Sequence, residues 1–181
     1  MQPRTVKYCR QCGAAVEMRI PDDGDTRERA VCPACGTIHY LNPLVVVGTV
    51  PFLGDQVLLC KRAIEPRLGK WTLPAGFMEM GETMAAGAER ETAEEAGAEV
   101  DMGPLFSTLS VPRVGQVHVF YLAPLRHERF NPGSESLEVR LFGESDIPWE
   151  EIAFTTVRET LHRFFDDHRQ GAFGQHDLNI P

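Results

Sequence analysis

The sequence predicts an α/β protein in which helices pack against a mixed β-sheet, preceded by a small separate domain. Two observations predict the sheet and its helices: aliphatic, β-branched runs follow Leu44 and Gln56, and helical patterns occupy residues 84–96 and the stretch after Thr156. The third observation is that paired cysteines occur only before residue 42. With 181 residues, 43% of them hydrophobic, the chain can bury one main core and a small appendage. We expect domains at residues 1–41 and 42–181.

Two Cys-Xaa-Xaa-Cys pairs define the N-terminal domain, Cys9 with Cys12 and Cys32 with Cys35. The polar stretch between the pairs contains Pro-Asp-Asp-Gly-Asp at residues 21–25, which is typical of a turn. Four thiolates in two such pairs suit tetrahedral zinc, because each short turn presents two sulfurs to one ion. We therefore expect a zinc ribbon with a structural Zn²⁺, whose complete set of thiolates leaves no position for catalysis.

The sheet of the second domain is expected to begin with a hairpin. The run Leu-Val-Val-Val-Gly-Thr-Val is followed, after Gly54 and Asp55, by Gln-Val-Leu-Leu-Cys-Lys. Further strands are expected at residues 105–111, 116–125 and 139–142, separated by loops that contain glycine and proline.

Two helices complete the expected α/β domain. The first covers residues 84–96, with Thr83 as N-cap and Gly97 just past its end. The second begins near Thr156, where Thr-Val-Arg-Glu matches a capping box, and places four large apolar residues on one face, namely Val157, Leu161, Phe164 and Phe165. The residues from Gly171 onward show no pattern, and we expect no chemistry there.

The first helix carries Glu91, Glu94 and Glu95 at positions i, i+3 and i+4, so their carboxylates share one face. Like charges at this spacing cost about 0.2–0.5 kcal/mol per pair, and carboxylates near a helix C-terminus oppose the helix dipole. One explanation is a solvated face on which Arg90 pairs with Glu94. The other is that the face binds cations, and the three glutamates alone do not decide between them.

The wider pattern resembles the complete Nudix box: Gly76, five residues, Glu82, seven residues, and then Arg-Glu-Thr-Ala-Glu-Glu-Ala-Gly-Ala at residues 90–98. Thr92 and Ala98 stand where the Nudix family usually has bulkier aliphatic residues, a departure that concerns packing. The resemblance implies a Nudix-type α/β/α sandwich with a mixed sheet, and an enzyme that hydrolyses phosphoric anhydride bonds.

Carried over to these positions, the resemblance implies that Glu91, Glu94 and Glu95 bind Mg²⁺ or Mn²⁺, with the backbone carbonyl of Gly76 as a further ligand. Hard cations of this kind prefer oxygen ligands and keep positions open for diphosphate oxygens. Arg90 is expected to orient the glutamates. For Glu82, a functional role and a purely structural ion pair with Arg90 remain equal alternatives.

Members of the family often add a glutamate from a distant loop as a metal ligand or general base. The candidates here are Glu135, in the turn-like Asn-Pro-Gly-Ser-Glu-Ser stretch, and Glu138, at the start of an alternating strand. We prefer Glu135, since a loop can lean over the metals. A solvated loop charge is the remaining alternative.

An N-terminal zinc ribbon joined to a Nudix box resembles the NADH pyrophosphatases and a second group that includes FAD and ADP-ribose pyrophosphatases. The second group is favoured, because Ser-Val-Pro-Arg-Val-Gly-Gln replaces the tryptophan- and proline-rich signature of the first. We expect cleavage of FAD or ADP-ribose to AMP and a phosphorylated product by attack of water at phosphorus. The alternatives are an NADH pyrophosphatase or RNA-decapping activity, and a non-catalytic, metabolite-sensing regulator that binds nucleic acid.

The net charge of −8 disfavours nucleic acid as a partner but suits small phosphorylated substrates bound through metal ions. The chain has no long apolar run and no signal-like N-terminus, so we expect a cytoplasmic protein without a membrane partner. Related proteins with this ribbon commonly form homodimers, which is the expected state here.

Several other residues with chemical potential receive no role. His39 could replace a zinc ligand, but four cysteines make this unnecessary. Cys60 lies in an apolar strand and is expected to be a small core residue. Phe77, Tyr121 and Phe154 could stack on a base, although aromatic residues at such positions are more often part of a core.

Overall fold

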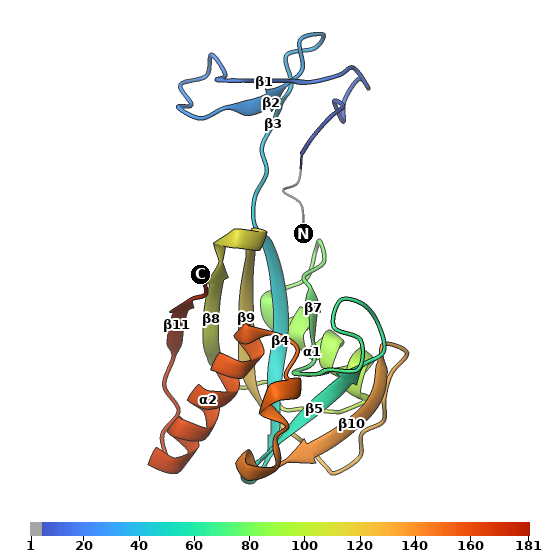
Figure 1. The fold of residues 1–181 in the computed structure, drawn as a ribbon, viewed down its shortest axis with the longest axis vertical. Helices are drawn as coiled ribbons and strands as arrows, with labels where there is room; N and C mark the ends of the chain where they lie inside the picture. Colours follow the sequence, from blue (N-terminus) through green and yellow to red (C-terminus); the bar gives the residue numbers. More distant parts are fainter. Residues whose placement is uncertain (1–4) are drawn as a thin grey trace. The chain divides into compact units, whose positions relative to one another are not determined.

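The computed structural model describes residues 5–181 and divides the chain into two compact units, the first ending at Pro43 and the second beginning at Leu44 (Figure 1). In the first unit, β1 (Glu17–Arg19), β2 (Arg29–Val31) and β3 (Ile38–His39) form a small antiparallel sheet in that order. The expected turn at residues 21–25 lies in the connection between β1 and β2. We call residues 5–43 the ribbon unit and residues 44–181 the main unit.

The main unit is built on a mixed sheet in which β10, β5, β4, β9, β8 and β11 are neighbours in that order. Two neighbouring pairs are parallel, β4 with β9 and β8 with β11, and the others are antiparallel. The strands are β4 (Leu44–Leu53), β5 (Gln56–Arg62), β6 (Trp71–Thr72), β7 (Ala75–Phe77), β8 (Leu105–Val111), β9 (Gln116–Pro124), β10 (Ser136–Phe142) and β11 (His176–Asn179).

Two helices cover opposite faces of this sheet, α1 (Met84–Ala96) and α2 (Thr155–Gln170). Successive residues of a strand point to opposite faces, and in β9 Val119 packs with Ala88 of α1 whereas Phe120 packs with Leu161 of α2. The predicted apolar face of α2 is buried along its whole length. The predicted α/β/α sandwich with a mixed sheet is therefore confirmed.

The expected hairpin of β4 and β5 is paired only near its turn, at Phe52 with Val57 and Leu53 with Gln56. Beyond these pairs the two strands separate, and β5 pairs with β6 while β4 pairs with β7. The chain between β6 and β7 thus passes from β5 to β4 and places Ala75 and Gly76 beside α1, with which β7 is in contact.

Two details of the C-terminal part differ from the prediction. The tail is not unpatterned, because His176–Asn179 forms β11, a parallel edge strand on β8. The predicted capping box is also wrong: the N-cap of α2 is Phe154, without a side-chain hydrogen bond, and the buried Thr156 hydroxyl has no hydrogen-bond partner among residues 5–181. Three 3-10 turns complete the unit, η1 (Pro112–Val114), η2 (Glu144–Asp146) and η3 (Trp149–Glu151). No helix in the described part of the chain is long and apolar enough to cross a membrane.

Candidate metal centre and active site

The helix α1 has the boundaries that the sequence predicts. The Thr83 side chain accepts a hydrogen bond from the Ala86 N–H at 3.1 Å, and Gly97 ends the helix in the left-handed region at φ 56°. Thr92, at a position where bulkier residues are usual, is buried and shares a 2.6 Å hydrogen bond with Thr49 of β4. The helix is therefore anchored to the sheet beneath the glutamates.

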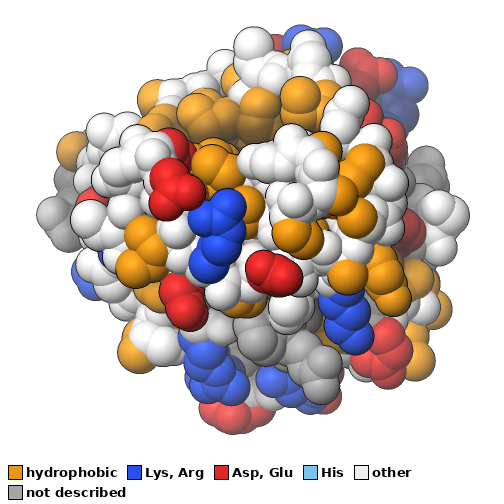
Figure 2. Space-filling view, turned by 90° about the horizontal axis from the view of Figure 1, so that it is seen from above, with side chains coloured by type: hydrophobic (Ala, Val, Ile, Leu, Met, Phe, Trp, Pro, Cys, Tyr) orange, Lys and Arg blue, Asp and Glu red, His pale blue; other side chains and the backbone are white. Residues whose placement is uncertain are grey.

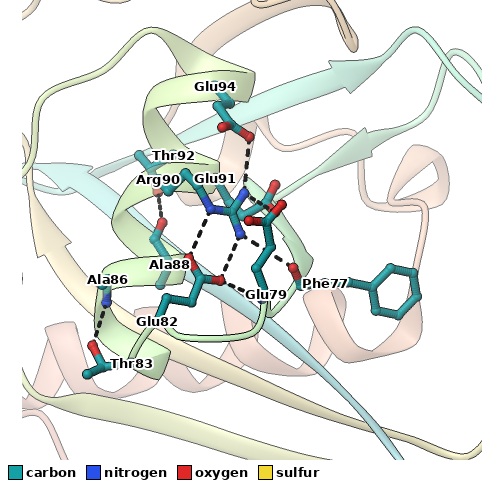
Figure 3. A network of polar contacts seen from close by, with 10 residues as sticks. All are labelled: Phe77, Glu79, Glu82, Thr83, Ala86, Ala88, Arg90, Glu91, Thr92 and Glu94. Carbon is teal, nitrogen blue, oxygen red and sulfur yellow. Dashed lines mark hydrogen bonds and ion pairs between the residues drawn. The ribbon is translucent and has the colours of Figure 1, made fainter.

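Arg90 lies at the centre of the carboxylate cluster (Figure 3). Its guanidinium donates to both oxygens of Glu82, at 3.1 and 2.9 Å, and to Glu91 at 2.8 Å and Glu94 at 3.1 Å. These bonds raise the pKa of Arg90, with those to Glu82 acting most strongly, and the Arg90 side chain lowers the pKa of Glu82. The structural ion pair foreseen for Glu82 is thus present, and the same arginine orients two of the three helix glutamates.

The third glutamate, Glu95, is turned into the protein. It is 8% exposed and accepts a hydrogen bond from the Ala75 N–H at 3.1 Å. Burial raises the pKa of Glu95 to about 7 and also raises the pKa of Glu91, since both carboxylates lose water on folding. A cation nearby would offset this cost, which makes the pair suited to metal binding.

Gly76 lies directly against the Glu91 carboxylate. A Cβ atom at position 76 would stand 2.3 Å from the Glu91 carboxylate oxygen, so the end of the Glu91 side chain would have to move. Glycine here lets the β7 backbone approach the carboxylate, as binding of one ion by both groups requires. The structure brings the predicted backbone ligand next to a predicted carboxylate ligand.

The loop before β10 is docked onto the C-terminal end of α1. The Asn131 N–H donates to the Ala96 carbonyl at 2.8 Å, and the Gly133 N–H donates to the Glu95 carbonyl at 3.1 Å. These bonds satisfy carbonyls that a helix end leaves free. They also bring Glu135 close enough for its charge to raise the pKa of Glu91 and of Glu95. The sequence pattern could not reveal this docking, because it depends on long-range backbone contacts.

The donor set fits a hard divalent cation, because it consists of carboxylate and backbone oxygens with one desolvated member. Among the described residues the carboxylates do not form a compact ligand group, and Glu91 and Glu94 instead both accept a hydrogen bond from Nη1 of Arg90. A bound ion would therefore either share Glu91 and Glu94 with Arg90 or displace Arg90 from them.

The four cysteines of the ribbon unit form a second cluster, whose sulfur atoms all lie within 4.8 Å of one another. Each pair is held by the same turn: the Gly13 N–H donates to the Cys9 carbonyl, and the Gly36 N–H donates to the Cys32 carbonyl, both at 2.9 Å. Tetrahedral zinc with sulfur at about 2.3 Å requires sulfurs about 3.8 Å apart. The closest pairs, at 3.5 and 3.6 Å, match this requirement.

The environment favours a thiolate at Cys35 but not at Cys12, whose pKa is raised to about 12 because the side chains of Cys32 and Cys35 outweigh the backbone hydrogen bond at Ala14. Hydrogen bonds from the Thr37 side chain and backbone lower the pKa of Cys35 to about 6. The thiolate is the form that binds zinc. His39 is buried and is not among the clustered ligands of the described residues, so the cysteines account for the expected site by themselves.

The remaining candidates lie elsewhere. Cys60 is buried in the core as expected, and burial raises the pKa of its thiol. Glu138 is exposed in β10, opposite Lys61 of β5. Of the aromatic residues, Phe77 is 48% exposed beside the Arg90 cluster, Tyr121 packs in the sheet beneath α1, and Phe154 packs against the core that α2 covers.

The fold and the carboxylate helix together define a Nudix-type protein, and comparison with known families agrees. The model of the Nudix N-terminal zinc ribbon matches residues 7–41, and the model of the NUDIX domain matches residues 42–168. The chain belongs to the NUDIX family.

Among solved structures, a NUDIX hydrolase from Nitrosomonas europaea is 51% identical, with a TM-score of 0.92 over 97% of this chain and 99% of that one. Among curated proteins, the NAD-capped RNA hydrolase NudC of Vibrio atlanticus is 24% identical over 97% of this chain and 63% of its own length. The ADP-ribose pyrophosphatase of Methanocaldococcus jannaschii is 28% identical over 60% of this chain and 67% of its own length. The chain thus spans less than two thirds of the NudC relative.

Proposed function

We propose that this protein is a metal-dependent pyrophosphohydrolase that cleaves the diphosphate of a small nucleoside diphosphate derivative, with FAD or ADP-ribose favoured. The observation that carries the proposal is the arrangement at α1: Glu91 and Glu95 are partly or largely desolvated, Gly76 packs on Glu91, and Glu94 remains exposed. A solvated charged face would not turn Glu95 into the core. The arrangement supports a cation site that faces a phosphorylated ligand.

In this proposal Glu91, Glu94 and Glu95, with the Gly76 carbonyl, hold Mg²⁺ or Mn²⁺. The ions supply charge that offsets the diphosphate and acidifies the attacking water. Arg90 keeps the glutamates in place through the bonds described above, and its bidentate pair with Glu82 fixes the arginine. Glu135 acts as a metal ligand or accepts the proton of the water, since the docked loop holds it beside the other carboxylates.

The proposal is tested by following products from FAD, ADP-ribose, NADH and NAD-capped RNA with Mg²⁺ or Mn²⁺. We expect AMP with FMN from FAD, or AMP with ribose 5-phosphate from ADP-ribose. In ¹⁸O-labelled water the label should enter a phosphate of one product. Release of free base, or label on a sugar carbon, would show a glycosidic cleavage, which requires a carboxylate pair flanking the sugar instead.

The second candidate function is removal of an NAD cap from RNA, which the similarity to NudC over nearly the whole chain favours. The charge of −8 opposes it, because a phosphate backbone is repelled by an acidic surface. Figure 2 shows acidic, basic and apolar side chains interspersed on the side that it draws. We therefore place small nucleotides before RNA.

We further propose that the protein acts in the cytoplasm as a homodimer, with zinc in the ribbon unit as a structural ion. The exposed apolar residues of the ribbon unit, such as Met18 and Ile20, support self-association. Light scattering coupled to gel filtration should give twice the mass of the chain. A single-chain mass at micromolar concentration would contradict the dimer.

A further inference from the structure

A small cavity lies between the loop that joins β5 to β6 and the first turn of α2. Its volume is about 270 Å³, and three of its lining residues are cationic: Arg67 and Lys70 from the loop, and Arg158 from α2. Phe154 and Thr155 line it as well, and Glu150 is the one carboxylate in the lining. Three cations around one cavity are notable in a chain with a net charge of −8.

These three cations are not neutralised by ion pairs within the described chain. The arginines in its ion pairs are others, namely Arg19, Arg29, Arg90, Arg126 and Arg169. The Arg158 guanidinium is held in place, because it donates to the Trp149 carbonyl at 2.8 Å. Its remaining N–H donors, and those of Lys70, are available to a ligand.

The backbone at Arg67 is strained. Its φ of 70° is the only positive value of a non-glycine residue among residues 5–181. An arginine gains nothing from this conformation, which costs of order 1–3 kcal/mol for a residue with a Cβ atom. A glycine at position 67 would remove this strain. We infer that the Arg67 side chain makes a favourable interaction that offsets the strain.

The cavity is connected to the metal centre through Arg62, at the end of β5. The Arg62 guanidinium carbon lies 5.2 Å from the centre of the Phe154 ring, and the backbone N–H of Arg62 donates to the Lys70 carbonyl at 2.9 Å. The same side chain acts through its charge on Glu95. A ligand whose diphosphate lies at the glutamates can thus extend past Arg62 towards the cavity.

The size and charge of the cavity indicate what it takes. Pockets for whole drug-sized ligands measure about 300–1,000 Å³, so this cavity suits one part of a nucleotide. We propose that Arg67, Lys70 and Arg158 bind a phosphate monoester of the substrate that is separate from the cleaved diphosphate. The substrate class is then a nucleoside diphosphate derivative with an additional phosphate on a ribose, an inference that rests on the proposed function.

The experiment compares substrates that differ only in a ribose 2′-phosphate: ADP-ribose with its 2′-phosphate, and NADH with NADPH. The protein should prefer the phosphorylated member by about tenfold in kcat/KM, expressed mainly in KM, since one charge-assisted contact contributes a factor of this size. Lys70→Met and Arg67→Gly should each lower this ratio at least threefold. Arg67→Gly should do so without lowering the Tm, because glycine accepts the positive φ.

The matched control is Arg163→Gln, which removes the same charge from an exposed position on α2 outside the cavity and should leave the ratio unchanged. The inference is overturned if the phosphorylated members are not preferred, or if the preference survives in both cavity variants.

Binding of adenosine 2′,5′-bisphosphate and of AMP to the full chain, measured by calorimetry, separates this inference from the proposed function. Tighter binding of the bisphosphate, lost in Lys70→Met, supports the cavity even if no dinucleotide is hydrolysed. Hydrolysis of both members of each pair at equal rates, with equal binding of the two probes, rejects the cavity and leaves the proposed function standing.

Discussion

The four thiols of the ribbon unit are gathered within 4.8 Å by two equivalent turns, whereas the carboxylates of α1 are spread along a helix and two of them are bonded to Arg90. The thiols form a complete tetrahedral set that needs nothing from the rest of the molecule. The carboxylates form an incomplete set that depends on β7, on the loop before β10 and, in our proposal, on substrate. A structural ion requires the first arrangement, and a catalytic ion requires the second.

This comparison predicts that substitutions of the α1 glutamates have the largest effects on turnover. Glu94→Gln and Glu95→Gln should each lower kcat by at least about a hundredfold, because metal-based charge stabilisation contributes several kcal/mol. Steady-state rates of AMP release measure the effect. Glu89→Gln is the control, since Glu89 is exposed on the same helix. Near-normal rates for Glu94→Gln with unchanged metal dependence would show that the glutamate face of α1 is only solvated and binds no catalytic metal.

The contribution of the docked loop is expected to be the next largest. Glu135→Gln should lower kcat about tenfold or more, the lower end of the cost of losing a contact that supports a metal site. Glu138→Gln, three residues further along in β10, should lower it much less. The opposite ranking would show that the exposed strand residue is the distal ligand and that the docked loop serves α1 alone.

Loss of one of the four clustered cysteines should unfold the ribbon unit locally and change catalysis little. Zinc analysis of the intact protein should give about one zinc per chain, and Cys12→Ser should release it and unfold the ribbon unit. Both tryptophans, Trp71 and Trp149, lie in the main unit, so their fluorescence reports that unit alone. Its thermal transition should be unchanged in Cys12→Ser. A protein purified without chelator and found free of zinc would contradict the prediction.

The smallest effect concerns pH, and it follows from the burial of Glu95. Its pKa in the folded protein, about 7, is above the ordinary value of 4.5, so the folded state binds the proton more tightly. Stability should therefore increase as the pH falls from about 7 to 4.5. Without divalent ions, Glu95→Gln should raise the Tm of the main unit at pH 8 and change it little at pH 5. Equal destabilisation by Glu95→Gln at pH 5 and at pH 8 would show that burial of the ionised Glu95 carboxylate does not lower stability as we infer.

The sequence predicts the parts of the molecule that depend on local chemistry. The α1 caps at Thr83 and Gly97, the apolar face of α2 and the paired cysteines all rest on residues close together in the chain. Long-range contacts cannot be predicted from these local patterns. The edge strand β11 has a short, polar sequence that is extended only because β8 accepts it as a neighbour. The bond from Ala75 to Glu95 likewise depends on the crossing of the chain between β6 and β7.

The central claim is that the glutamates of α1 bind a divalent cation, and titration of Mn²⁺ followed by electron paramagnetic resonance tests it most directly. Zinc-loaded protein should bind Mn²⁺, and Glu91→Gln and Glu94→Gln should each weaken binding at least about tenfold, because even loss of an outer contact to a metal site costs about 10–100-fold. Glu89→Gln should bind as the unaltered protein does. Identical titrations for all four proteins would contradict the claim.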